Sequence, residues 1–323
     1  MFKIGNVEIK GRVVLAPMAG VTSLAYRNFM KPFGVALTVT EMVSDCGLIY
    51  DNVRTVEYIK TTEEERPIAI QLFGSSAETI CRAMDVVLEK NPNIDMFDIN
   101  LGCPAPKVVK TGAGSALLKD PKKLEEMFKI ICAHSPIPVT AKIRLGWNED
   151  TLNFRENIKS LENAGIAAIG LHARTTRAGY AGKPRWDLVK DLRDEMSVPL
   201  IISGDMYDIS YARKALEITH ADAIMVARGG VGNPKLIERL NAYFDGKGEK
   251  PYPTKEEQKQ YLLKFADMLI EEKGEYTAMM ALRGIAPKFF SGFPDAKKLR
   301  CKLVSGLTTK QSLLKILGEI KED

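Results

Sequence analysis

DMFDINLGCPAPK, residues 95–107, passes from an apolar run through a polar end into a loop that contains glycine and proline. The same order recurs from residue 12 to about residue 240: a short apolar run, a glycine or polar residue, then a longer charged stretch. Nearly continuous apolar runs of this length are typical of parallel strands covered by helices.

Eight such runs alternate with helix-like stretches. They are RVVLAPM (12–18), VALTVTEMV (35–43), PIAIQLF (67–73), DMFDINL (95–101), PVTAKIRL (138–145), IAAIGLHA (166–173), VPLIIS (198–203) and DAIMVAR (222–228). Strands that alternate with helices predict βαβ units. Eight units in one span predict an α/β fold, a (β/α)8 TIM barrel, rather than an open sheet.

The residues that follow these runs are the candidates for chemistry. In a TIM barrel the loops after the strands meet at the carboxyl face, where active sites lie. Topology therefore brings together polar residues that are far apart in sequence: Gln71, Asn100, Cys103, Lys142, His172, Arg174 and Arg228.

The pattern changes at about residue 241. NAYFDGKGEKPYPTK (241–255) is rich in Gly, Pro and Lys and is typical of a linker. Beyond it, QYLLKFADMLIEEKG (260–274) has apolar residues at helical spacing and a glycine suited to end a helix. We expect a barrel domain over 1–240 and a small all-helical domain over 241–323.

Composition narrows the class of protein. The 323 residues are 45% hydrophobic and 27% charged, with a formal net charge of +5, which permits an anionic partner without requiring one. Five cysteines without a CxxC pair argue against a disulfide framework or a zinc site and favour a reducing compartment. The sequence shows no signal peptide and no apolar stretch of ~18 residues. We expect a cytoplasmic monomer without a metal or a membrane anchor.

Cys103 is the strongest candidate for a catalytic residue. A single cysteine is most often a small buried hydrophobic residue. Here it stands between Gly102 and Pro104, just past a strand on the predicted catalytic face, which is a poor place to bury a side chain. A thiol of ordinary pKa, about 8.5, is mostly protonated at neutral pH and can act as an acid.

Lys142 lies inside an apolar strand, where a lysine rarely lacks a partner. It could pair with Asp98 or Glu41, or it could hold a negatively charged ligand. His172 and Arg174 follow the sixth run on the catalytic face, which favours a functional role.

The other two histidines precede strands rather than follow them. His134 and His220 are therefore expected on the opposite face, in structural roles.

The last two runs end in SGDM (203–206) and ARGGVGNP (227–234). Loops after strands 7 and 8 of TIM barrels often bind phosphate through backbone N–H groups. Each glycine cluster could also be a simple turn. Together they predict a phosphorylated cofactor held by Ser203, Gly204, Asp205, Ala227, Arg228 and Gly229.

The segment RGIAPKFFSGFPDAKKLRCK (283–302) holds six basic residues and a single acidic one. Such a run is usually a solvated face, but interleaved phenylalanines also suit contact with a nucleic acid. Lys297, Lys298 and Arg300 are the candidates for that contact.

Taken together, these motifs resemble the tRNA-dihydrouridine synthases. The segments that carry the resemblance cover most of residues 10–235: APMAGVTSLAYR (16–27), TEMVS (40–44), IQLFG (70–74), DINLGCPAPKVVKTGAGSALLKDP (98–121), AKIRLGW (141–147), LHARTTRAGYAGKPRWD (171–187) and SGDM (203–206). The helical tail is similar to the family's tRNA-binding domain.

The resemblance implies a role for each candidate. Pro17, Met18 and Ala19 would line the ring of an FMN, Gln71 and Lys142 would contact its polar edge, and His172 would lie beside flavin and substrate. Cys103 would be the acid, with Asn100 and Arg174 near the substrate. Two positions depart from the family pattern: Ser203 stands where Asn is usual, and Ala227 where Gly is usual. Backbone N–H groups in these phosphate loops survive either change.

The reaction implied is the NADPH-driven, FMN-dependent reduction of specific uridines in tRNA, with the uridine extruded from the RNA stack. Three alternatives stay open. They are an FMN barrel reductase of a small pyrimidine or enone, dihydrouridine synthesis in another RNA, and an RNA-binding protein that has lost turnover.

Overall fold

The computed structural model describes residues 1–294 and 296–320. All eight predicted strands are present, and all are parallel. In chain order they are β3 (Val13–Leu15), β4 (Thr38–Val39), β6 (Ile68–Phe73), β7 (Met96–Asn100), β8 (Val139–Arg144), β9 (Ala168–His172), β10 (Leu200–Ser203) and β11 (Ala223–Val226). A short extra strand, β5 (Val43–Ser44), also pairs with β6. The sheet order β3-β11-β10-β9-β8-β7-β6-β4 is that of a barrel opened at one seam.

The seam between β3 and β4 is joined by backbone hydrogen bonds. Val14 and Leu37 form an isolated parallel bridge. The Leu15 N–H donates to the Leu37 carbonyl at 2.9 Å, and the Ala36 N–H donates to the Val13 carbonyl at 2.8 Å. The barrel therefore closes, which confirms the predicted (β/α)8 architecture.

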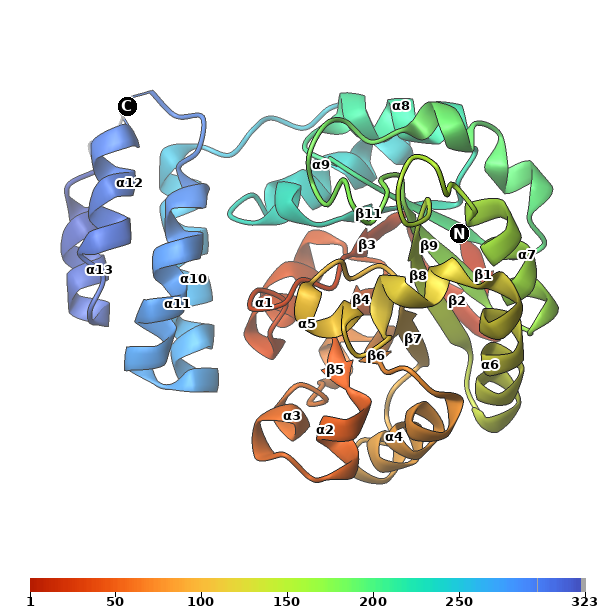
Figure 1. The fold of residues 1–323 in the computed structure, drawn as a ribbon. Coiled ribbons are helices and arrows are strands. Elements are labelled where there is room, and N and C mark those ends of the chain that lie inside the picture. Colours follow the sequence, from red (N-terminus) through yellow and green to blue (C-terminus); the bar gives the residue numbers. More distant parts are fainter. Residues whose placement is uncertain (295, 321–323) are drawn as a thin grey trace.

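Helices surround the barrel (Figure 1). Several begin at a side-chain cap that the sequence supplies, such as Ser76, Asp120 and Asp208. The α-helices of the barrel domain are α1 (Leu24–Met30), α2 (Asp45–Ile49), α3 (Val53–Glu57), α4 (Ala77–Lys90), α5 (Pro106–Val109), α6 (Pro121–His134), α7 (Phe154–Asn163), α8 (Ile209–Thr219) and α9 (Lys235–Phe244).

The connection after β9 differs from the predicted pattern. Two 3₁₀ helices, η4 (Trp186–Val189) and η5 (Leu192–Glu195), stand where an α-helix was expected. Gly179, Gly182 and Pro184 shorten the stretch that could be helical, since glycine and proline disfavour a helix interior. The rest of this connection is a loop over the carboxyl face.

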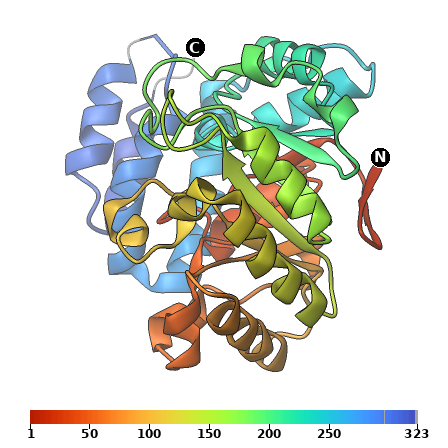
Figure 2. The ribbon, with the colours of Figure 1, turned by 45° about the vertical axis from the view of Figure 1, so that its right-hand side comes forward.

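A hairpin that the sequence reading missed precedes the barrel. It consists of β1 (Phe2–Ile4) and β2 (Val7–Ile9), paired antiparallel. Ile4 and Ile9 are fully buried in the cluster of side chains that fills the barrel interior. In Figures 1 and 2 the hairpin lies on the side of the barrel away from the C-terminal helices.

The C-terminal helices are α10 (Lys255–Lys273), α11 (Glu275–Phe289), α12 (Ala296–Ser305) and α13 (Lys310–Gly318), here called the helical module. The module packs on α1 through aromatic rings. Phe265 lies 5.7 Å from Tyr26 and 5.3 Å from Phe29 between ring centroids. In addition, the Glu272 carboxylate accepts from the Ser23 hydroxyl at 2.8 Å and from the Ala25 N–H at 2.9 Å. Its position relative to the barrel is therefore fixed by packing and hydrogen bonds.

The predicted linker begins later than expected. Residues 241–244 belong to α9, whose apolar face packs on the barrel, so the connecting segment is 245–254. Even this segment contacts the barrel, since the Arg239 guanidinium donates to the Lys250 carbonyl and lies 3.6 Å from the Tyr252 ring centroid. Across the described residues, the structure contains no helix both long and apolar enough to span a bilayer.

Candidate active site

A cavity of about 370 Å³ opens at the carboxyl face of the barrel, between the loops that follow the strands. It brings together all the residues predicted to contact the cofactor, and also Cys103 and Asn100. These lining residues are Pro17, Met18, Ala19, Gln71, Asn100, Cys103, Lys142, His172, Ser203, Gly204, Asp205, Ala227, Arg228 and Gly229.

The loop that carries Cys103 is held by hydrogen bonds to its main chain. The Asn100 side-chain oxygen accepts from the Gly102 and Cys103 N–H groups at 3.1 and 2.8 Å. The Cys103 carbonyl accepts from the Ser115 hydroxyl at 2.9 Å. These contacts leave the thiol free to face the cavity, where it is half-buried.

A chain of side-chain hydrogen bonds across three strands fixes Asn100 in turn. The Asn100 amide donates to Gln71 Oε1 at 2.8 Å, and the Gln71 amide donates to Asp98 Oδ2 at 2.6 Å. Thr140 donates to the other oxygen of Asp98 at 2.6 Å. Buried polar networks of this kind rigidify a site when every member is satisfied. The position of Cys103 therefore depends on residues of β6, β7 and β8.

Lys142 lines the cavity without a partner of its own. Its ammonium makes no hydrogen bond or ion pair with any residue that the structure describes, so neither Asp98 nor Glu41 neutralises it directly. Burial lowers the pKa of Lys142 to about 8; Arg144 also lowers it, while Asp98 and Cys103 oppose the shift. An unpaired cation in such surroundings suits an anionic ligand.

His172 and Arg174 form one unit with Asp205 and Arg228. An Arg174 Nη1–H approaches His172 Nε2 at 3.2 Å, and Arg174 also pairs with Asp205 at 2.6 Å. Arg228 donates to the same carboxylate at 2.9 Å. Burial, and then Lys142 and three arginines, lower the pKa of His172 well below its usual value. His172 is thus neutral at neutral pH, and because arginine can only donate, its Nε2 accepts and its Nδ1 carries the proton.

Arg174 itself does not line the cavity. Its guanidinium is buried, and its donors also reach the Ala181 and Gly182 carbonyls at 3.2 and 2.6 Å. The structure therefore places Arg174 behind His172 and Asp205, rather than at the surface of the cavity as expected of a substrate contact.

The basic end of the cavity is built by the loops after β10 and β11. A Cβ atom on Gly229 would lie 2.0 Å from the Met206 carbonyl oxygen, so only glycine fits there. The Arg228 guanidinium lies over two rings, 4.7 Å from the centroid of Tyr180 and 5.8 Å from that of Tyr207. This end is therefore tightly packed and positively charged.

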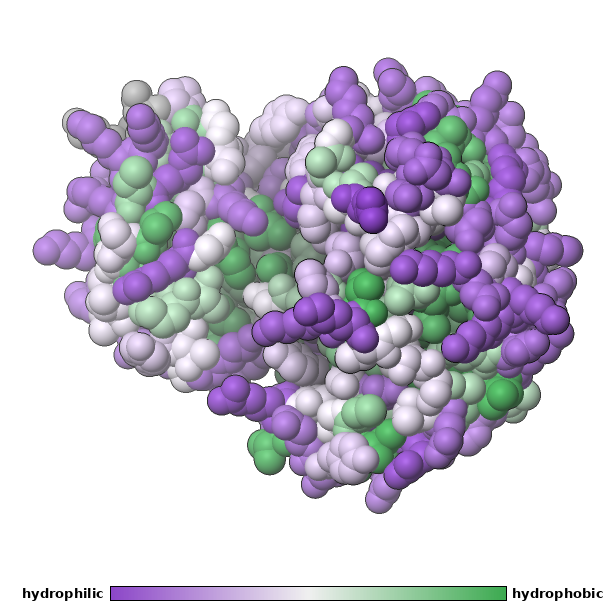
Figure 3. Space-filling view, in the orientation of Figure 1, coloured by the Kyte–Doolittle hydropathy of each residue, from purple (hydrophilic) through white to green (hydrophobic). Residues whose placement is uncertain are grey.

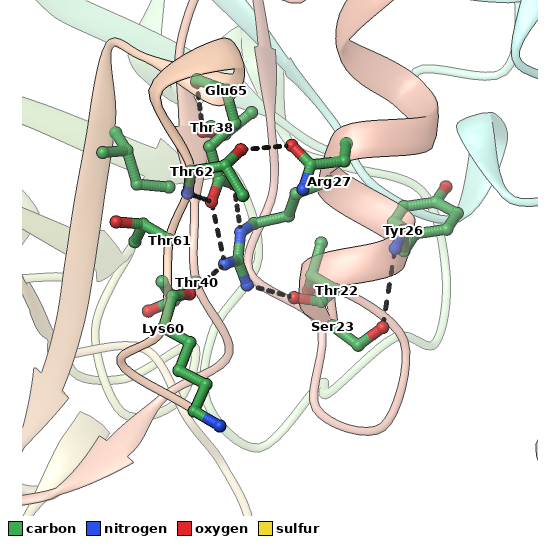
Figure 4. Close-up of polar contacts among 12 residues, drawn as sticks. Thr22, Ser23, Tyr26, Arg27, Thr38, Thr40, Lys60, Thr61, Thr62 and Glu65 are labelled. Atoms are coloured by element: carbon green, nitrogen blue, oxygen red, sulfur yellow. Dashed lines mark hydrogen bonds and ion pairs between the residues drawn. The ribbon is translucent and has the colours of Figure 1, made fainter. Parts of the chain in front are cut away.

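The loop between β3 and α1, which supplies Pro17, Met18 and Ala19, is held at two points, Gly20 and Thr22. Glu41 Oε2 accepts from the Gly20 N–H at 2.5 Å. Arg27, in the middle of α1, forms a fully buried ion pair with Glu65 at 2.6 Å and donates to the Thr22 carbonyl at 3.0 Å (Figure 4). The apolar wall of the cavity thus rests on a buried charge pair.

Other lining residues were not predicted, among them Met42, Arg144, Tyr180 and Lys288. Arg144 donates to the Gly102 and Gly179 carbonyls at 2.7 and 2.8 Å and so ties the Cys103 loop to the loop after β9. The alternation of side chains along a strand could have identified Arg144, since Lys142 and Arg144 share one face. No local signal marks Lys288, which comes from α11 of the helical module.

The basic residues of α12 lie elsewhere. Lys297 and Lys298 are exposed, Arg300 is half-buried, and none of the three lines the cavity. Figure 3 shows a hollow between the helical module and the barrel, with hydrophobic groups at its base. His134 and His220 lie outside the cavity and are exposed; His134 contacts Asp85, and His220 contacts Asp191 and Asp194.

Comparison with known proteins gives a consistent result. The family model described as "Dihydrouridine synthase (Dus)" matches residues 14–322. A probable tRNA-dihydrouridine synthase of Aquifex aeolicus is 34% identical over 97% of this chain and 97% of its own length. One from Rickettsia bellii is 33% identical over 93% of this chain and 92% of its own. The tRNA-dihydrouridine synthase B of Shewanella oneidensis is 33% identical over 87% of each chain.

Solved structures with a similar fold are more distant in sequence. An old yellow enzyme homologue from Zymomonas mobilis matches with a TM-score of 0.53 and 13% identity, over 80% of this chain and 94% of its own. Morphinone reductase in complex with tetrahydroNAD has the same TM-score and identity, over 80% and 92%. At this identity the likeness concerns the barrel fold.

Proposed function

Since this chain belongs to the dihydrouridine synthase family of oxidoreductases, we propose that it reduces uridines of tRNA to dihydrouridine, with electrons that pass from NADPH through a bound FMN. The observation that carries the proposal is the cavity itself, which unites Cys103 with every residue predicted to contact the flavin.

The lining suits a flavin mononucleotide on physical grounds. The cavity volume of about 370 Å³ falls within the range of small-molecule sites, roughly 300–1,000 Å³. Apolar side chains such as Pro17 and Met18 line part of the cavity. Four cationic side chains also line it: Lys142, Arg144, Arg228 and Lys288. The sole carboxylate of the described lining, Asp205, is already bound by two arginines. Such a site repels cations and accepts an apolar ring that carries a phosphate.

When bound, FMN supplies the hydride for C6 of uracil after accepting one from NADPH. Cys103 donates its thiol proton to C5, so that the C5=C6 bond becomes saturated, and the thiolate then recovers a proton from water. The Asn100 contacts hold the thiol-bearing loop in place during this transfer. The uridine must leave the RNA stack to reach the cavity.

The remaining residues hold charge and orientation. Lys142 offers its unpaired ammonium to the polar edge of the ring, where it stabilises negative charge. His172 presents a neutral imidazole beside the cavity, and Arg174 fixes its tautomer. Asp205 orients Arg228 and contributes to phosphate binding through its main chain, because its carboxylate is occupied. Ser203, Gly204, Ala227 and Gly229 supply the rest of the phosphate loops.

We place tRNA across the helical module as well as the cavity mouth. The barrel, predicted over 1–240 and extended to residue 244 by α9, acts as the catalytic domain, and the helical module acts as the RNA-binding domain, with Lys297, Lys298 and Arg300 on α12 contacting phosphates. We expect the enzyme to work as a cytoplasmic monomer.

The direct test uses the purified protein. We expect it to be yellow, with one non-covalent FMN per chain, and to convert uridine to dihydrouridine in an unmodified tRNA transcript when NADPH is present. Mass spectrometry of the digested RNA measures the product. Free uridine, free uracil and a ribosomal RNA fragment serve as parallel substrates. A colourless protein that takes up no FMN, or turnover confined to a free pyrimidine, contradicts the proposal.

A further inference from the structure

The helical module contributes one side chain to the cavity of the barrel. Lys288, in the last turn of α11, lines the cavity along with Arg228, Gly229 and Val231 from the loop after β11. The ammonium of Lys288 is exposed and forms no hydrogen bond or ion pair within the part of the chain that the structure describes. A residue outside the barrel thus presents a free cation at the basic end.

The position of Lys288 is fixed by close contact between α11 and this loop. Gly232 has φ +72°, and a Cβ atom there would lie 2.5 Å from the carbonyl carbon of Lys288. The Gln258 amide of α10 donates to the Gly232 carbonyl at 2.9 Å, and this bond is buried. Helices α10 and α11 therefore both contact the loop after β11. The contact with Gly232 also fixes the main chain of Lys288, from which its side chain extends.

The charges at this end of the cavity show what Lys288 adds. Arg174 and Arg228 share a single carboxylate, that of Asp205, at 2.6 and 2.9 Å. These three side chains leave one positive charge in excess, and Lys288 raises the excess to two. A phosphate monoester carries about −1.5 to −2 charges at pH 7. The sum matches a terminal phosphate, whereas an RNA phosphodiester has a single charge.

We propose that Lys288 binds the phosphate of the flavin cofactor, so that the helical module completes the cofactor site of the barrel. This inference rests on the proposed function, because it takes FMN as the ligand. It gives α11 a role in cofactor binding in addition to any contact with RNA.

The test compares FMN with riboflavin, which lacks the phosphate, on full-length apoprotein by quenching of flavin fluorescence. In Lys288→Gln we expect the dissociation constant for FMN to rise about 3- to 30-fold, as for loss of a partly exposed charged hydrogen bond. The constant for riboflavin should stay the same. Lys264→Gln is the matched control, since Lys264 is an exposed lysine of α10 that does not line the cavity. Lys288→Arg should restore most of the FMN affinity.

Three results overturn the inference while leaving the proposed function intact. Equal losses for FMN and riboflavin would show that Lys288 only supports packing. Unchanged FMN affinity with weaker tRNA binding and a smaller salt slope would assign Lys288 to the RNA backbone. Unchanged affinity for all three ligands would leave it a solvated side chain. Wild-type protein that binds no FMN would instead refute the proposed function, and with it the inference.

Discussion

The carboxyl face of the barrel and helix α12 are both rich in cations, yet they hold them differently. At the carboxyl face, Arg144 and Arg174 are each 2% exposed, and Lys142 lines the cavity together with Arg144. On α12, Lys297 and Lys298 are exposed to solvent. A buried cation costs desolvation and keeps a fixed direction, so it suits a ligand bound in one pose. An exposed cation suits a polyanion whose counterions it displaces.

The largest expected effect on the reaction rate is at Cys103, which supplies the thiol of the cavity lining. Cys103→Ala should leave reduction of FMN by NADPH unchanged, because that half-reaction needs no proton from the thiol. Reoxidation of the reduced flavin by tRNA should slow by about 10²–10⁴-fold, the usual contribution of general acid catalysis. Stopped-flow flavin absorbance separates the two half-reactions.

Cys103→Ser provides the graded variant, since a hydroxyl keeps the shape but is a weaker acid than a thiol. We expect it to be no slower than Cys103→Ala in the tRNA step. If tRNA reoxidises the flavin of the alanine variant at nearly the wild-type rate, Cys103 is not the acid.

The buried ion pair between Arg27 and Glu65 should contribute more to the free energy of unfolding than the exposed pair between Lys302 and Glu319 in the helical module. Glu65→Gln leaves Arg27 buried without its carboxylate and should lower the free energy of unfolding by about 3–5 kcal/mol. Glu319→Gln removes the exposed partner of Lys302 and should change the free energy of unfolding by less than ~1 kcal/mol. Chemical denaturation measures both, and similar values for the two variants would refute the contrast.

Lys142 should make FMN binding in the cavity depend on pH. Its pKa is lowered to about 8, so the ammonium is present below that pH and is lost as the pH rises through it. The facing groups are Arg144, Asp98, Cys103 and the neutral His172. If the ammonium binds the flavin, FMN affinity should fall about tenfold between roughly pH 7 and pH 9. Lys142→Met should bind FMN more weakly, and its FMN affinity should no longer depend on pH in this range. A Lys142→Met variant with the wild-type pH profile would show that Lys142 does not bind the flavin.

The smallest effect is expected on α12. Replacing Lys297, Lys298 and Arg300 together by glutamine should weaken tRNA binding about three- to tenfold and reduce its salt slope by about 2 to 3. NADPH oxidation in the absence of RNA should not change, because none of the three lines the cavity. Filter binding over a range of salt concentrations provides the measurement. An unaltered affinity and slope would mean that this face is merely solvated.

Much of the barrel could be predicted from sequence, because its signals are local. Each strand is a continuous apolar run, and topology alone gathers Cys103, Lys142 and His172 at one face. The hairpin of residues 2–9 was not predicted, because each of its two strands has three residues and is too short to show a hydrophobic period.

The functions of single polar residues were harder to predict. Arg174 looks like a substrate contact in sequence, but its direction is set by Asp205 and by two loop carbonyls that only the folded chain brings near. Lys288 lies 146 positions beyond Lys142, in another structural unit, and its place depends on helix packing against Gly232. Such long-range contacts leave no periodic trace in the sequence.

The most direct measurement of the central claim is a map of dihydrouridine in tRNA from cells that lack this gene. Mass spectrometry should show particular uridines unmodified in these cells. Expression of the wild-type chain should restore dihydrouridine at the same positions, and expression of Cys103→Ala should not. A dihydrouridine pattern that is unchanged by deletion of the gene, or that is restored equally by both chains, would contradict the account.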